Sequence, residues 1–145
     1  NLLDTHTMYE NISMPLALAG YDAKTQTEAL PKALRLAAAG DMDLGTACDL
    51  VTDEMSAMSM TTEDLDTYVD QMARTAQRSN TSVSQLGEAT LVVAGTATTA
   101  NQSLTTMNTQ LGILANNGIK GAEGGTHLRN IILSLSAPTD NASEA

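Results

Sequence analysis

The sequence predicts an all-α protein: a compact array of about six or seven short helices, joined by short loops and without a sheet. Aromatic residues make up only 2% of the 145 residues, and the apolar 42% contains many Ala, Leu and Met residues. These three residue types favour helices, whereas the aromatic residues that favour strands are nearly absent. Apolar residues also recur at intervals of three and four along most of the chain. We expect a single helical domain over residues 1–138 and a disordered tail over 139–145.

The first two predicted helices each contain a proline. One helix is expected over residues 6–19, where Pro15 must lie in a first turn or at a kink. Thr25 and Glu28 then form a capping-box pattern that predicts the start of a second helix. Pro31 inside this helix predicts a bend or two shorter pieces. Its apolar stripe runs through Leu30, Leu34 and Ala37 and stops near Gly40.

The next two helices have clear apolar stripes. Asp43 can cap the first of them, and the lone Cys48 falls on its stripe as a small buried thiol. The stripe consists of Leu44, Ala47, Cys48, Val51, Met55 and Met58. Thr62 precedes Glu63 and Asp64, which are favourable in the first turn of the following helix, and Arg74 and Arg78 complement its carboxyl-terminal end. The stripe of that helix consists of Leu65, Val69, Met72 and Ala76.

Three further helices are expected in the second half of the chain. Ser82 and Gln85 form a capping box, and the apolar positions that follow are Val83, Leu86, Ala89 and Val93. The run Leu91–Val93 could also form a short strand, but no other segment could pair with it, which favours a helix. Ser103 can cap the next helix, whose stripe Leu104, Met107, Leu111 and Leu114 ends at Gly118. The last helix is expected from about Glu123 to Ser136, with Leu128, Ile131, Ile132 and Leu135 on its apolar face and Pro138 ending it.

The charge is strongly negative and unevenly distributed. The chain has a formal net charge of −10, and thirteen of the seventeen acidic residues lie in residues 1–80. Such a charge argues against a surface that binds nucleic-acid phosphates. The weakly charged residues 81–145 are either the buried half of one domain or a surface that meets other copies or a partner.

The candidate catalytic and metal-binding groups do not form a complete site. Asp49, Asp53 and the neighbouring Glu54 are expected on the polar face of a helix, where nothing raises the pKa of a general acid. Glu123 and His127 are four residues apart and could touch one metal ion, but a site requires three or four ligands. We therefore predict no catalytic residue, metal or cofactor, and the longest apolar runs are too short for a membrane span.

The segment Leu111–Asn130 breaks a helical pattern with glycines and then resumes it. Gly121–Gly124 matches the GxxG pattern of an RNA-binding loop, but that loop requires flanking strands and positive charge. Lys120 precedes the glycine instead of following it, and no strand leads in, so a phosphate-binding P-loop is also excluded. The remaining interpretation is that the glycines cap helices and allow two helices to approach closely.

The sequence of this segment resembles that of a known family. The run Leu114–Asn130 is similar to a signature in the core region of phage tail tape measure proteins. Further blocks resemble that region in the same order: Leu30–Pro31 with Leu36–Ala39, Asp49–Asp53, Asn80–Val83 with Leu86–Glu88, and Pro138–Thr139. The matching signature residues are Asn116, Gly118, Ile119, Lys120, Gly121, Gly125, Thr126, Leu128 and Arg129. His127 and Gly124 depart from the family pattern, which puts the start of the last helix in question.

The resemblance implies a structural role without catalysis. A tape measure protein lies extended in the tail tube of a phage, and its length sets the length of the tail. The implied partners are other copies of the chain, the tail tube protein, tail-tip proteins and an assembly chaperone. The implied locations are the virion tail and, during assembly, the host cytoplasm.

Two other functions stay open. A generic helical adaptor without a ruler role would have the same composition, and the ordered blocks of similar sequence alone argue against it. An enzyme would need a pocket that brings Glu123 and His127 to the Asp49 and Asp53 face. The chain begins at Asn1 without an initiating Met, which we interpret as the start of a fragment of a longer protein.

Overall fold

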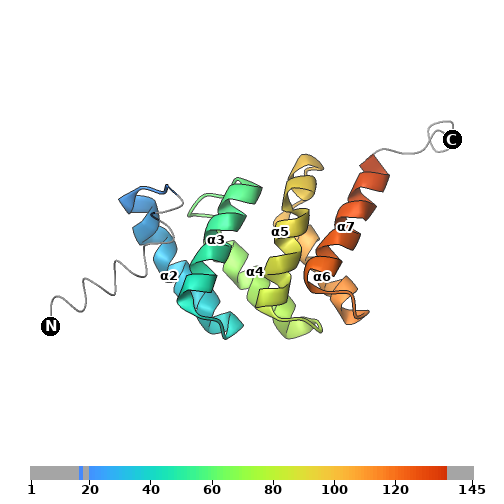
Figure 1. Cartoon of the computed structure of the whole chain (residues 1–145), viewed down its shortest axis with the longest axis horizontal. Coiled ribbons are helices and arrows are strands. Elements are labelled where there is room, and N and C mark those ends of the chain that lie inside the picture. The colour runs from blue at the N-terminus through green and yellow to red at the C-terminus, as the bar shows by residue number, and fades with distance from the viewer. Residues whose placement is uncertain (1–16, 18–19, 137–145) are drawn as a thin grey trace. The chain divides into compact units, whose positions relative to one another are not determined.

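The computed structural model describes residue 17 and residues 20–136 (Figure 1). Their six helices are α2 (Ala23–Gly40), α3 (Leu44–Met58), α4 (Leu65–Arg78), α5 (Val83–Thr99), α6 (Leu104–Asn116) and α7 (Gly121–Ser136). No strand occurs in this described part of the chain, which confirms the all-α prediction. The helix predicted over 6–19 falls almost wholly outside the described residues, and the tail predicted over 139–145 does so entirely.

The chain forms two compact units, residues 1–73 and residues 74–145. The first unit contains α2, α3 and most of α4, and the second contains the end of α4 with α5, α6 and α7. The two units do not test the single domain expected over 1–138, which stays a prediction.

Helix α2 begins earlier than predicted. Asp22 is its N-cap, and the Asp22 carboxylate accepts a hydrogen bond of 2.8 Å from the Thr25 amide. The predicted cap at Thr25 is therefore wrong, because the aspartate three residues earlier already satisfies that amide. Pro31 lies within α2, which is one helix and not two shorter pieces. The buried face consists of Ala29, Ala33 and Leu36, whereas Leu34 of the predicted stripe is 49% exposed.

Helix α3 confirms its predicted cap. The Asp43 carboxylate accepts hydrogen bonds from the Thr46 amide at 3.0 Å and the Thr46 hydroxyl at 2.5 Å. The buried residues include the predicted Ala47, Cys48, Val51 and Met55. Glu54, however, is fully buried, so the prediction that it lies on the solvent-exposed face is wrong. The buried arc of α3 is wider than one stripe, because Leu50 and Thr52 are buried as well.

Helix α4 begins at Leu65, directly after Glu63 and Asp64, which were expected in its first turn. The Asp64 carboxylate accepts from both the amide and the hydroxyl of Thr61 at 2.8 Å, and Asp64 directly precedes the helix. The Thr62 hydroxyl donates to Glu28 at 2.6 Å. The buried residues of α4 are Leu65, Tyr68, Val69 and Met72.

In the second unit, α5 and α7 lie side by side and share the most extensive helix contact, and α6 contacts both (Figure 1). The capping box of α5 is formed as predicted: the Gln85 amide donates to the Ser82 hydroxyl at 3.1 Å, and the Ser82 amide donates to Gln85 Oε1 at 3.3 Å. Residues 91–93 are helical, which excludes the strand alternative. Ser103 caps α6 with a hydrogen bond of 3.1 Å from the Thr106 amide, also as predicted.

Candidate functional site

The glycine joint, residues 116–125, connects α6 to α7. At the end of α6, the Gly118 amide donates to the Ala115 carbonyl and the Ile119 amide donates to the Leu114 carbonyl, each at 3.0 Å. This pair of bonds is the Schellman pattern, which needs a left-handed residue directly after the C-cap. Gly118 supplies it with φ +86°, so the predicted cap is confirmed.

Helix α7 starts two residues before the expected Glu123. Its first residue, Gly121, has φ +62°, a value that glycine adopts without the strain of a Cβ atom. A Cβ at Gly121 would also stand 3.0 Å from Glu88 Oε2. The sequence pattern missed this start because the first turn of α7 contains glycines instead of a polar capping residue.

Two further glycines allow close contact between backbones. A Cβ atom at Gly125 would stand 2.3 Å from the Ala89 carbonyl oxygen and 2.9 Å from Val92 Cβ. A Cβ at Gly124 would stand 3.1 Å from the Ile119 carbonyl oxygen. Helix α7 therefore lies directly on the backbone of α5, as the interpretation of close helix approach expected.

The other signature residues surround these glycines. Asn116 Oδ1 accepts a hydrogen bond of 2.8 Å from the Asn80 amide, which ties the end of α6 to the turn before α5. The Thr126 hydroxyl donates to the Ala122 carbonyl at 2.9 Å, one turn earlier in α7. Leu128 is buried in the core at 2% exposure, while Arg129 is exposed. Ile119 and Lys120 are half-buried. Six of the nine residues lie within the joint, and Thr126, Leu128 and Arg129 follow it in α7; their role as a family signature stays a prediction.

The space beneath the joint is narrow. It lies between α5, α6 and α7 and is too narrow for a water molecule. Leu86, Leu111 and Ile119 are among the residues that line it. What the arrangement can do is fix the direction in which the chain leaves α6.

The candidate chemical groups stay apart from one another. His127 Nε2 lies 3.8 Å from Glu123 Oε1, and both side chains are more than half exposed. No group of three or more potential metal ligands occurs among residues 20–136. Asp49 and Asp53 are exposed on α3, and Glu54 is buried away from them. Nothing here assembles an acid, a base and a nucleophile around a pocket.

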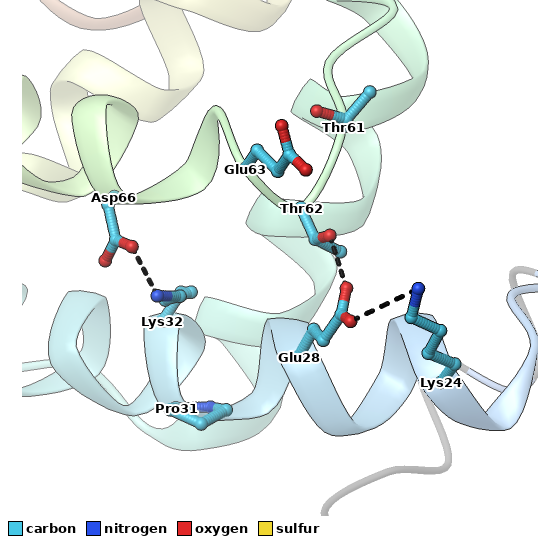
Figure 2. A pocket seen from close by; sticks show the side chains of 8 residues that line it. All are labelled: Lys24, Glu28, Pro31, Lys32, Thr61, Thr62, Glu63 and Asp66. Atoms are coloured by element: carbon cyan, nitrogen blue, oxygen red, sulfur yellow. Dashed lines mark hydrogen bonds and ion pairs between the residues drawn. The ribbon is translucent and has the colours of Figure 1, made fainter.

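Figure 2 shows an open hollow of about 550 Å³ in the first unit, between α2 and the segment 61–66. It is lined by Lys24, Glu28, Pro31, Lys32, Thr61, Thr62, Glu63 and Asp66. Most of its charged groups pair with one another. Glu28 contacts Lys24 at 3.7 Å and accepts from Thr62, and Lys32 donates to Asp66. The bond from Lys32 lowers the pKa of the Asp66 carboxyl below its usual value.

Arg35 extends this pairing outside the hollow. Its guanidinium donates to Asp66 and to Asp70 at 2.6 Å each, so charge pairs join α2 to α4. No local sequence pattern predicts these contacts, because their partners lie more than thirty residues apart. The hollow presents paired side chains and no set of groups directed at a ligand.

None of the helices that the structure describes combines the length and the apolar composition that crossing a membrane requires.

Comparison with known proteins supplies the identity that the geometry leaves open. The sequence matches the family of phage-related minor tail proteins over residues 6–145. It is also 31% identical over 124 residues to the tape measure protein of Pneumococcus phage Dp-1, an alignment that covers 86% of this chain and 11% of that protein. No solved structure matches the chain. The chain therefore belongs to the phage-related minor tail protein family and corresponds to a region of a phage tail tape measure protein.

Proposed function

We propose that this chain is a section of a tape measure protein that occupies the lumen of the tail tube and contributes to the length of the tail. The observation that carries this proposal is the alignment with a protein of that name, of which the aligned region covers only 11%. The chain is a small section of such a protein, so its own contribution to tail length would be a fraction of the total.

The helical structure is physically suited to a protein whose length sets the length of the tail. An α-helix rises 1.5 Å per residue, so the length of helices laid end to end increases in proportion to the number of residues. Laid out in this way, the described residues would span up to roughly 180 Å. The compact units are a shorter form of the same helices, and a ruler role requires them to open.

The proposed role is structural, with no catalytic step in this region. The proposed partners are the other tail components: further copies of the chain, the tube protein, tail-tip proteins and an assembly chaperone. The proposed locations are the virion tail and, during assembly, the host cytoplasm. The net charge of −10 is consistent with this setting, because an acidic protein in a DNA conduit does not hold the phosphates.

A helical interaction module without a ruler role is the second candidate. The last two turns of α7 favour it, because Ile131, Leu133 and Leu135 are 48%, 50% and 77% exposed. Apolar side chains gathered at a helix end are common where a protein binds a partner.

An in-frame deletion of residues 20–136 in a phage that encodes this chain separates the two functions. The ruler predicts intact tails that are shorter by as much as roughly 180 Å, measured by electron microscopy. A duplication of the same residues should lengthen the tails. A Gly125→Ala phage is the matched control, because it disturbs the helix packing and keeps the number of residues, so its tails should keep their length. Deletion tails of normal length would rule out the ruler and leave the interaction module.

A further inference from the structure

Each compact unit has a buried polar side chain that finds no hydrogen-bond partner among the described residues. Tyr68 on α4 is fully buried, and its hydroxyl has no partner among the described residues. Asn108 on α6 is 2% exposed, and neither its Oδ1 nor its Nδ2 is bonded. Since the great majority of buried polar groups are hydrogen-bonded, two such side chains in the cores of a small protein call for an explanation.

The buried neighbours of Tyr68 along α4 are apolar and offer its hydroxyl no hydrogen bond. Its helix neighbours Leu65, Val69 and Met72 are buried with it in the first unit. Burial, and after it the negative charge of Glu54, raises the pKa of the Tyr68 hydroxyl well above its usual value of 10.0. The neutral hydroxyl therefore stays in the core as a donor whose hydrogen bond to water was lost on folding and not replaced.

Asn108 lies on a tightly packed part of α6. It precedes Gly112 by four residues and so shares its face of the helix. A Cβ at Gly112 would stand 2.6 Å from Ser79 Oγ and 3.1 Å from Thr75 Cγ2, so this face is pressed against the end of α4. The carboxamide of Asn108 is buried on the same face. An apolar side chain there would not bury an unbonded polar group.

We propose that Tyr68 and Asn108 are built-in weak points that lower the stability of the two compact units and keep them ready to open. A buried polar group without a partner destabilises the folded state, whereas an apolar group of similar shape at the same place does not. The purpose of the weak points rests on the proposed function, in which the compact helices become an extended ruler. Their existence is a property of the chain itself and can be tested without a tail.

The test compares the melting temperatures of purified variants of the whole chain. Tyr68→Phe removes only the hydroxyl oxygen and should raise the melting temperature by roughly 5 °C, the order expected when one unmet polar group leaves a unit of this size. Asn108→Leu should raise it similarly, and slower amide exchange in α4 and α6 should accompany the two changes.

Two control variants should not raise the melting temperature. Tyr21→Phe changes a half-buried tyrosine and should leave the melting temperature nearly unchanged. Asn116→Leu removes the acceptor of the Asn80 amide and should lower it.

An unchanged or lower melting temperature in Tyr68→Phe would overturn the inference for the first unit. Because Leu could be too bulky at position 108, Asn108→Ala is measured beside Asn108→Leu. A rise in either variant supports the inference for the second unit, and a rise in neither overturns it. The deletion experiment on tail length tests the proposed function separately. The weak-point inference can therefore fail while the ruler function holds, and the ruler function can fail while the weak points hold.

Discussion

Substitution of Gly125 by Ala gives the sharpest test of the packing of α7 on α5. The added Cβ atom would stand 2.3 Å from the Ala89 carbonyl oxygen, 3.0 Å from the Ala89 carbonyl carbon and 2.9 Å from Val92 Cβ. Two of these atoms belong to the backbone of α5, so no side-chain rotation can relieve the contact. The two helices must move apart by about 1 Å, because carbon and oxygen atoms that are not bonded need more than 3 Å.

The cost follows from two opposing effects. Moving packed helices apart typically costs about 1–3 kcal/mol, and more where the backbone itself blocks the new atom. Replacing glycine by alanine inside a helix raises the free energy of unfolding by roughly 0.5–1 kcal/mol, because alanine loses less backbone entropy on folding. We therefore expect Gly125→Ala to lower the free energy of unfolding by about 1–2 kcal/mol.

Urea denaturation followed by circular dichroism measures this change, with Gly95→Ala as the matched control. Gly95 is exposed in α5, and a Cβ there would meet no atom within 4 Å. Only the helix-propensity effect remains at that position, so Gly95→Ala should raise the free energy of unfolding by roughly 0.5–1 kcal/mol. If both variants were equally stabilised, α7 would not lie on the α5 backbone and the account of the joint would be wrong.

Three other variants probe the joint, the core and the buried tyrosine. Gly118 has φ +86° and open space around it, so Gly118→Ala should cost about 1 kcal/mol of unfolding free energy through strain alone, and an unchanged melting temperature would count against the cap. Leu111 is 2% exposed, so Leu111→Ala should cost roughly 2–5 kcal/mol in denaturant titrations, and a much smaller loss would place it on the surface. The pKa of Tyr68 is raised in the folded state, so its ionisation does not affect folding below the usual pKa of 10.0, and the free energy of unfolding falls as the pH rises above that value. Tyr68→Phe should therefore unfold at a higher pH in an alkaline titration, and identical titrations would contradict this linkage.

Local capping chemistry made several helix starts predictable from sequence. The caps at Asp43, Ser82 and Ser103 are correct, because a capping side chain and its amide partner lie only three residues apart. The expected start of α2 is wrong because Asp22, three residues before Thr25, accepts the hydrogen bond from the Thr25 amide. The expected first turn of α4 is wrong because Asp64 accepts from the Thr61 amide in a turn that precedes the helix.

Burial was harder to predict, because it depends on elements far away in the sequence. Periodicity identifies residues that can share a helix face, but not how much of the helix its neighbours cover. Glu54 is covered although it lies beside the exposed Asp53, and Leu34 is exposed although it follows the stripe spacing. The ion pairs of Lys32 and Arg35 with α4 likewise come from tertiary packing alone.

The glycines of the joint shape the backbone and the helix packing. Gly118 and Gly121 supply two positive φ angles within four residues, and Gly124 and Gly125 leave space that backbone atoms of Ile119 and α5 use. None of the four offers a functional group. A phosphate-binding loop would use glycines to bring backbone amides to a ligand, whereas here the Gly118 amide donates to a carbonyl of the same chain. Because the glycines serve backbone geometry, selection for a structural joint can preserve such a segment without any bound ligand.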